Sequence, residues 1–447
     1  MNKYVYAFII SVIIFSVGSY ANDFKIDIKN AVTLRGVKYW YVQNNDLPVV
    51  SLSVAFKKAG YAYDPSEKKG IASLVTNVIK EDMRGPGQVP MEVKLAYDGV
   101  ELIFSVDREN FYVHLKTLSS NLSIALGHLY YCLSEYVVFQ DTLDRIKSQQ
   151  QATIKRLKSH PDLVASYGLN KMLFGHHPYS YSKYGTEETI SNITVYDVEN
   201  YIKNKFNIKN MVIGVVGNFK VEDLSEAIDN CFAELNIKVD RTEDIDIEQV
   251  KVGHNLHGYI YMDTPQSIIM TAQKGISYNH PDYYAVYLLN HIIGGLPLNS
   301  MLMKKLRDNL GITYRTYSYL NNDDHGNTWI SVLYTDNTTV DKGVSVLLDT
   351  IRDIKKNGVD RNIFDMAKSS VINTFIFSLL TVDNIADLLV DTQLRELDIN
   401  YLNKRNFYFN AVTLDDVNRV AKSFLIDKLS IIEVGRSNHF KGKVIKH

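Results

Sequence analysis

The stretch from Lys68 to Asp82, KKGIASLVTNVIKED, has the apolar spacing of a helix with one buried face. Its apolar side chains recur every three or four residues, which is the period of an α-helix, at Ile71, Leu74, Val75, Val78 and Ile79. The other face carries Ser73, Thr76, Asn77 and Lys80. Ser73 and Asn77 have the i, i+4 spacing at which two helical side chains can hold one metal ion. Neither residue type is a good metal ligand, so the pattern predicts a packed helix with the geometry of a metal site but without its ligands.

The same order of apolar and polar segments occurs twice along the chain. Residues 48–65, PVVSLSVAFKKAGYAYDP, correspond to residues 265–281, PQSIIMTAQKGISYNHP. Residues 193–217, ITVYDVENYIKNKFNIKNMVIGVVG, correspond to residues 412–435, VTLDDVNRVAKSFLIDKLSIIEVG. The offset is 217 residues between Pro48 and Pro265 and 218 between Gly217 and Gly435. A near-constant offset of this length indicates two homologous units.

Each unit is predicted to begin with strands, continue with helices and close with a strand. In the first unit we expect strands at 49–56 and 211–216, and helices at 71–82, 109–135, 140–158 and 195–206. This order favours the α+β class, with an antiparallel sheet and helices on one of its faces. We expect a first domain over 22–235, a charged linker over 236–254 and a second domain over 255–447. Two facing half-shells of this kind could enclose a cavity.

The first 21 residues have the pattern of a secretory signal. Lys3 precedes an apolar run over 5–17, and Ser19 and Ala21 supply small residues where cleavage would occur. We expect an exported protein, periplasmic in a bacterium, that starts at Asn22 after cleavage. The alternative is an uncleaved anchor, but the run is short for a span of about 20 residues. No later segment is long and apolar enough to span a bilayer.

Composition narrows the function classes. The formal net charge of −1 argues against a general nucleic-acid binder, which needs a basic surface. Cys132 and Cys231 lie in apolar, helix-like contexts, so two buried thiols are favoured. A disulfide between them remains open in an oxidising compartment. The two cysteines do not have the spacing of a zinc site.

Three long motifs resemble the pitrilysin/insulinase-type zinc peptidases, in particular their processing-peptidase branch. Residues 173–219, LFGHHPYSYSKYGTEETISNITVYDVENYIKNKFNIKNMVIGVVGNF, resemble a signature in the middle of the family's first domain. GIASLVTNVI, at 70–79, falls where the family has its zinc helix. LNHIIGGLPLNSMLMKKLRDNLGITYRTYS, at 289–318, resembles a signature of the second domain. The resemblance extends over essentially the whole chain after the signal.

The resemblance implies that a zinc site has been lost. Active members carry H-x-x-E-H, two zinc ligands with a general base between them, where this chain has Ser73, Thr76 and Asn77. The third family ligand, a glutamate, aligns with Thr153. We therefore expect no metal and no catalytic residue of its own in this chain, and Lys80 on the same helix face would further disfavour a cation. A replacement site that uses His176 and His177 is a weaker alternative.

The resemblance also implies a substrate-binding pair in the second domain. In family heterodimers, an Arg and a Tyr from the subunit without zinc reach toward substrate at the partner's metal, and Arg307 and Tyr314 match those positions. An Arg can bind a peptide carbonyl or carboxylate, and a Tyr hydroxyl can donate to a developing oxyanion. We expect Arg307 near a helix end that Gly311 terminates, and a strand in which Ile312, Tyr314, Thr316 and Ser318 share a face. Without the resemblance, the pair could equally be a helix-ending Arg and a half-buried strand Tyr.

These observations favour the non-catalytic subunit of an exported heterodimeric zinc peptidase. A zinc-bearing partner would hydrolyse peptides, and this chain would close the chamber and position the substrate. The alternative is an inactive homodimer that binds peptides or acts as a scaffold. An active metallopeptidase with atypical ligands is the third hypothesis. GGLP, at 294–297, is too short for the glycine-rich loop of the non-catalytic mitochondrial subunit, so capture of presequences by such a loop is not supported.

Overall fold

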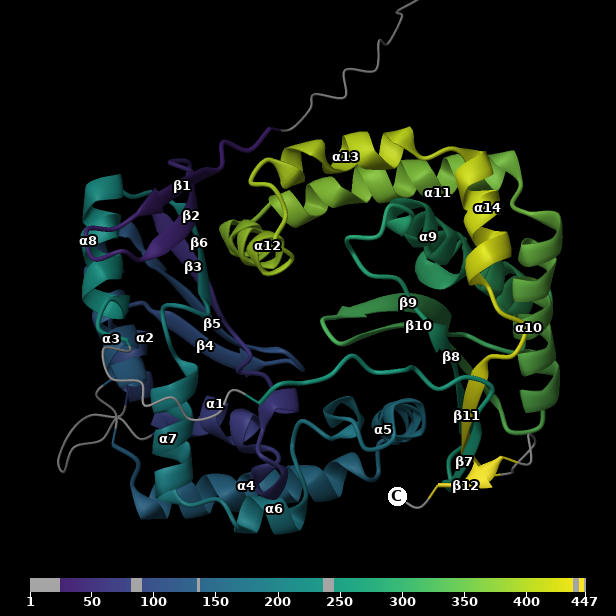
Figure 1. The fold of residues 1–447 in the computed structure, drawn as a ribbon, viewed down its shortest axis with the longest axis horizontal. Helices are drawn as coiled ribbons and strands as arrows, with labels where there is room; N and C mark the ends of the chain where they lie inside the picture. Colours follow the sequence, from purple (N-terminus) through teal and green to yellow (C-terminus); the bar gives the residue numbers. More distant parts are fainter. Residues whose placement is uncertain (1–24, 82–90, 135–136, 236–244, 437–441, 446–447) are drawn as a thin grey trace, which may run out of the picture.

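The computed structural model describes residues 25–81, 91–134, 137–235, 245–436 and 442–445. The predicted signal segment, 1–21, and residues 236–244 of the predicted linker lie outside this range. Within it the chain forms two six-stranded sheets with helices packed around them, which confirms the α+β class (Figure 1).

The first sheet has the strand order β1-β2-β6-β3-β5-β4 and the second has β12-β7-β11-β8-β10-β9. The first sheet consists of β1 (Lys29–Val32), β2 (Lys38–Gln43), β3 (Val49–Lys57), β4 (Glu101–Val106), β5 (Asn110–Leu118) and β6 (Met211–Gly217). The second consists of β7 (His257–Tyr261), β8 (Gln266–Lys274), β9 (Thr316–Asp323), β10 (Gly326–Asp336), β11 (Ser430–Gly435) and β12 (Lys443–Val444). Five strands of each sheet follow the same order, as expected of a repeated unit.

The sheets are mixed, whereas the sequence analysis predicted antiparallel ones. β2 pairs with β6 in parallel, and β7 pairs in parallel with both β11 and β12. The remaining pairings are antiparallel, including those of the long central strands β3 and β8. The β2–β6 and β7–β11 pairs are parallel because the strand after the helices of each unit returns to lie beside the opening strand, a connection that a hairpin cannot make.

The helices also follow the repeat. The first unit contains α1 (Ile71–Glu81), α2 (Met91–Tyr97), α3 (Leu122–Ser134), α4 (Gln140–Leu157), α5 (Pro161–Phe174), α6 (Glu187–Ser191), α7 (Val195–Lys205) and α8 (Val221–Phe232). The second contains α9 (Tyr283–Asn290), α10 (Val340–Asn357), α11 (Arg361–Thr374), α12 (Val382–Leu394), α13 (Tyr401–Ala411) and α14 (Leu414–Phe424). Capping boxes at Thr194–Asp197 and Thr413–Asp416 start the equivalent helices α7 and α14.

One predicted helix is partly wrong. Residues 109–135 were expected to be helical, but β5 occupies Asn110–Leu118 before α3 begins at Leu122. In NFYVHLKTL the buried apolar residues Phe111, Val113 and Leu115 alternate with more exposed ones, which is the period of a strand with one buried face.

The two units exchange a helix, so part of the second face of each sheet is covered as well. α5 of the first unit packs on the second sheet, where Val164 and Leu169 join a core with Ile268 and Ile432. α12 of the second unit packs on the first sheet, where Leu389 joins a core with Val216 (Figure 1). The sequence analysis predicted helices on one face only. Part of the second face is buried because residues 161–174 and 382–394 cross between the units.

No single helix within the described ranges has the length and apolar character to cross a membrane. Two segments, Arg361–Leu379 and Val382–Leu394, meet the criteria only as a pair, and that pair is bent by 114°.

Candidate functional site

Two of the three degenerate positions on α1, Thr76 and Asn77, bond to their own helix. Ser73 and Thr76 are buried, and Asn77 is exposed. The Thr76 hydroxyl donates to the Ser73 carbonyl oxygen at 2.7 Å, and the Asn77 amide approaches the same oxygen at 3.4 Å. Such local bonds to the preceding turn satisfy a polar side chain without any ligand.

Asp64 fixes the start of α1. Its carboxylate accepts hydrogen bonds from the backbone N–H groups of Gly70 (2.8 Å) and Ala72 (3.3 Å), which have no partner within the helix. Burial raises the pKa of Asp64 to about 8, against the lowering effect of these bonds. The helix is therefore held by its cap and its apolar face, and neither depends on a metal.

Gln150 ties α4 to the start of α1. Its buried side-chain amide donates to the carbonyl oxygens of Gly70 and Tyr184, both at 3.0 Å. Thr153, the position of the third family ligand, lies on the same helix α4 and is half-buried. α1 and α4 pack against each other, so the two helices of the degenerate site remain neighbours.

Within the described ranges, no group of three or more His, Cys, Asp or Glu side chains could hold a metal ion. The adjacent histidines do not join the α1 positions in any described contact. His177 Nε2 lies 2.9 Å from the Glu248 carbonyl oxygen, and its other ring nitrogen accepts from the Tyr179 N–H. His176 is exposed.

Arg307 and Tyr314 both project into solvent from the second unit. Arg307 lies in a π-helical turn, Met303–Asp308, and the Gly311 N–H bonds to its carbonyl oxygen at 2.9 Å. Gly311 has φ +64°, the left-handed conformation expected of a glycine that ends a helix. The Tyr314 side chain is 83% exposed. In the described part of the chain, neither side chain makes a hydrogen bond or ion pair, so both are available to a ligand.

The predicted strand around Tyr314 is partly wrong. β9 begins at Thr316, and Thr316 and Ser318 are buried whereas Tyr314 is exposed. Thr313 causes the interruption, because its hydroxyl accepts from the Arg315 N–H at 3.0 Å and donates to the Arg315 carbonyl oxygen at 2.9 Å. This local turn keeps Tyr314 out of the sheet and turns it outward.

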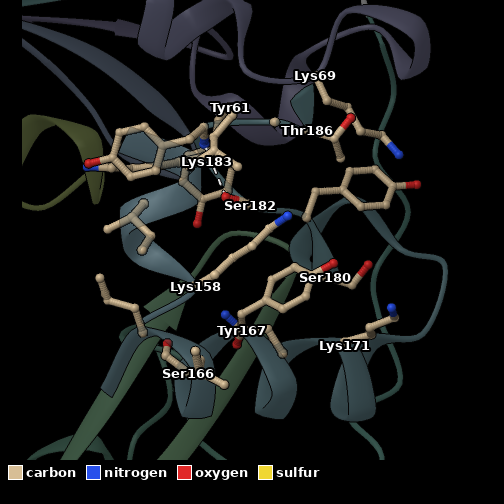
Figure 2. A pocket seen from close by; sticks show the side chains of 18 of the residues that line it. Tyr61, Lys69, Lys158, Ser166, Tyr167, Lys171, Ser180, Ser182, Lys183 and Thr186 are labelled. Atoms are coloured by element: carbon tan, nitrogen blue, oxygen red, sulfur yellow. Dashed lines mark hydrogen bonds between the residues drawn. The ribbon is translucent and has the colours of Figure 1, made fainter. Parts of the chain in front are cut away.

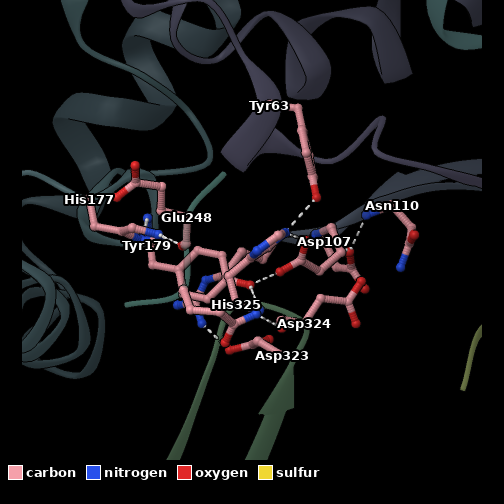
Figure 3. A network of polar contacts seen from close by, with 12 residues as sticks. Tyr63, Asp107, Asn110, His177, Tyr179, Glu248, Asp323, Asp324 and His325 are labelled. Carbon is pink, nitrogen blue, oxygen red and sulfur yellow. Dashed lines mark hydrogen bonds and ion pairs between the residues drawn. The ribbon is translucent and has the colours of Figure 1, made fainter. Parts of the chain in front are cut away.

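A buried polar network joins the two units, and the sequence analysis missed it (Figure 3). The Tyr179 hydroxyl donates to the Glu109 carboxylate and accepts from the backbone N–H of His325 at 2.8 Å. Tyr63 Oη and His325 Nε2 are 2.9 Å apart. Glu109 follows β4, and His325 occupies the β9–β10 turn, so the network links hairpins more than two hundred residues apart in the chain.

An ion pair adds to this polar contact between the two units. Arg108 pairs with Asp323, and its guanidinium lies 4.5 Å from the centroid of the Tyr179 ring. Burial, together with the neighbouring Asp324 and Asp323, raises the pKa of Glu109 to about 8. In the sequence these residues lie in two acidic turn segments, DREN at 107–110 and DDHG at 323–326. Neither segment has a pattern that predicts contact with the other.

Comparison with known proteins relates the chain to the M16 peptidases and their non-peptidase homologues. Residues 192–371 match a family profile described as "Peptidase M16 inactive domain". The chain is 22% identical to "Non-peptidase homolog YmxG" of Helicobacter pylori over 75% of this chain and 76% of that protein. It is 20% identical to "Uncharacterized zinc protease YmxG" of Bacillus subtilis over 92% and 99%.

A mitochondrial relative and a solved structure show the same relationship to the M16 peptidases. The chain is 19% identical to the mitochondrial-processing peptidase subunit beta of Blastocladiella emersonii, over 84% of this chain and 82% of that protein. The crystal structure of a peptidase M16 inactive domain from Pseudomonas fluorescens superposes with a TM-score of 0.85 and 24% identity, covering 94% of this chain and 100% of that chain. This superposition establishes the half-shell fold.

Proposed function

From the premise that this chain is a non-catalytic homologue in the M16 peptidase family, we propose that it is one subunit of an exported heterodimeric zinc peptidase. A zinc-bearing partner supplies the hydrolytic site. This chain closes the chamber and positions the peptide. One observation carries the proposal: Ser73, Asn77 and Thr153 stand at the ligand positions and Thr76 at the general-base position, while the side chains of Arg307 and Tyr314 are exposed and make no hydrogen bond or ion pair with a described residue.

The two exposed side chains have the chemistry that the proposal needs. The Arg307 guanidinium is a planar, permanently charged donor that suits a peptide carbonyl or a terminal carboxylate. The Tyr314 hydroxyl can donate to an oxyanion that forms at a metal site across the chamber. Both side chains are exposed and make no hydrogen bond or ion pair with a described residue, so they are accessible to a substrate that lies against this surface.

The similarity to processing peptidases supports a peptidase partner. The mitochondrial relative is named as a subunit, which is the kind of assembly proposed here. Export rests on the segment 1–21, whose pattern predicts a cleaved signal and a periplasmic location in a bacterium.

The test is reconstitution. The mature chain is mixed with a zinc-bearing homologue that carries H-x-x-E-H, and the initial rate of peptide hydrolysis is measured with and without this chain. The proposal expects a raised rate, and it expects Arg307→Ala to remove most of the gain. Peptide binding without any effect of Arg307 on hydrolysis would instead favour the homodimeric peptide-binding scaffold.

A further inference from the structure

A cavity of about 760 Å³ lies between the end of α4, one side of α5, the segment over residues 175–186 and the start of α6 (Figure 2). This volume is within the range of sites for small ligands or a few peptide side chains. The cavity contains none of the degenerate metal positions and neither Arg307 nor Tyr314. It adjoins the degenerate site, because Lys69 precedes α1 and Ile154 follows Thr153 on α4.

The cavity lining is cationic. It includes four lysines against two glutamates, namely Lys69, Lys158, Lys171 and Lys183 with Glu187 and Glu188. Only Lys158 has an acidic partner in the described chain, Glu187 at 3.5 Å. The other three lysines form no ion pair with a described carboxylate, so their charges are not neutralised locally.

Tyrosine rings lie beside these uncompensated lysines. Lys69 Nζ is 3.1 Å from the centroid of the Tyr181 ring, and Lys183 Nζ is 4.9 Å from that of Tyr184. A ring face stabilises an ammonium group without cancelling its charge. Lys69 is also half-buried, so its attraction for an anion is less screened than at a fully exposed site.

Neutral donors and apolar groups complete the lining. Figure 2 shows the Lys158 side chain extending between Tyr167 and Ser182. Ser180 is buried at the cavity wall, while Leu157 and Val164 supply apolar surface. A ligand with both carboxylates and an apolar or aromatic side chain would satisfy both kinds of surface.

We propose that this cavity binds an acidic segment of a peptide, with Asp or Glu carboxylates at Lys69, Lys171 and Lys183 and an apolar side chain against the tyrosine rings. The three lysines come from separate segments of the chain, which suits carboxylates spread along a peptide better than one compact anion. The inference rests on the proposed function, since it assigns a substrate class to a chain that handles peptides.

The experiment is isothermal titration calorimetry of the mature chain with three capped peptides. The first contains two glutamates beside a phenylalanine, and the matched peptides carry glutamine or lysine in place of glutamate. We expect the glutamate peptide to bind about tenfold or more tightly than the glutamine peptide, because charge-assisted hydrogen bonds are the stronger kind. The lysine peptide should bind most weakly, and added salt should weaken only the glutamate peptide appreciably.

Variants assign the binding to the cavity. Lys69→Gln with Lys183→Gln should lower the affinity for the glutamate peptide about tenfold, because two of the three lysines that bind its carboxylates are lost. Lys342→Gln, an equal charge change per site at an exposed position on α10, should leave it unchanged. Thermal unfolding by circular dichroism checks that every variant is folded. Equal binding of the glutamate and glutamine peptides, or unchanged affinity in the double variant, overturns the proposal.

The peptide-binding test and the reconstitution of hydrolysis can fail independently of each other. Selective binding of the acidic peptide without activation of a zinc-bearing homologue would overturn the proposed function and leave this site in place. Activation without selectivity for acidic peptides would do the reverse.

Discussion

Gly214 of β6 and Ala386 of α12 approach so closely that a Cβ atom at position 214 would lie 2.6 Å from the Ala386 carbonyl oxygen. The two residues belong to different units, and their contact is part of the reciprocal exchange of α5 and α12. A glycine is needed at this strand position because the backbone of the other unit occupies the space that a side chain would take.

Gly214→Ala should therefore destabilise the whole chain by roughly 3 kcal/mol, because the clash is with backbone that cannot rotate away. The matched control is Gly168→Ala on α5, where the added Cβ meets only the ends of the Ile432 and Ile260 side chains, at 2.5 and 2.8 Å. Those side chains can move, and alanine favours a helix over glycine by about 1 kcal/mol. Urea unfolding measures both. Equal, small losses of unfolding free energy in the two variants would show that α12 is not tightly packed against β6 at Gly214.

Much of the first unit could be predicted from periodicity. The predicted helix at 71–82 is observed at Ile71–Glu81, and that at 195–206 at Val195–Lys205, because each has a clear apolar stripe. The strand over 110–118 was missed because only Ser119–Asn121 separates its alternating residues from α3, so the two apolar patterns run together. Ser73, Thr76 and Asn77 could be predicted to lie close together on one helix because they are only three or four residues apart in the sequence.

Contacts between the units could not be predicted in the same way. The periodicity of α5 indicates a helix but not which sheet it will cover. The Glu109–Tyr179–His325 network depends on two hairpins that meet only in the folded chain. Tyr314 was placed on a strand because the Thr313 turn, one hydroxyl bonded to Arg315, is invisible to an alternation pattern.

The Glu109 network should make stability depend on pH. The pKa of Glu109 is raised from 4.5 to about 8 by burial, so the folded chain keeps a proton that the unfolded chain releases. The corresponding stabilisation is present below pH 4.5 and is lost as the pH rises to about 8. The stability of the wild type relative to Glu109→Gln should therefore fall across this window and then become constant.

This difference is measured by urea unfolding of both proteins at several pH values between 4.5 and 8. Comparison with the variant removes the contributions of other titrating groups, such as His291, whose pKa is lowered to about 4 by burial. Glu226→Gln, at an exposed site on α8, is the control and should track the wild type. A wild-type curve that runs parallel to that of Glu109→Gln would contradict the assignment.

Tyr179→Phe should lower the free energy of unfolding by about 1–3 kcal/mol. It leaves the buried Glu109 carboxylate and the backbone N–H of His325 without their shared partner. Tyr196→Phe removes a hydroxyl from a side chain that is 72% exposed and should have no measurable effect. Thermal unfolding followed by circular dichroism compares the two. If both variants melt with the wild type, the network does not hold the units together.

The degenerate site should leave the purified chain without bound zinc. Hydroxyl and amide groups at Ser73, Asn77 and Thr153 do not replace imidazole and carboxylate as zinc ligands. Metal analysis after dialysis should give well below one zinc per chain. Stoichiometric zinc that is abolished by Asn77→Ala would instead establish an atypical metallopeptidase.

Arg307→Ala and Tyr314→Phe should each lower the hydrolysis rate of a reconstituted complex, by about 100-fold where an oxyanion donor is lost. Neither change should affect stability, because both side chains are exposed and make no described bond. Arg352→Ala removes an equally charged, exposed residue from α10 and serves as the control. Loss of rate in the control as well would point to a general charge effect rather than to substrate positioning.

The most direct measurement is the initial rate of peptide hydrolysis by a zinc-bearing homologue from the same organism, titrated with this chain and accompanied by size-exclusion chromatography of the mixture. We predict that the two chains co-elute and that the rate rises until they are equimolar. A homologue that is fully active alone and never co-elutes with this chain would contradict the account.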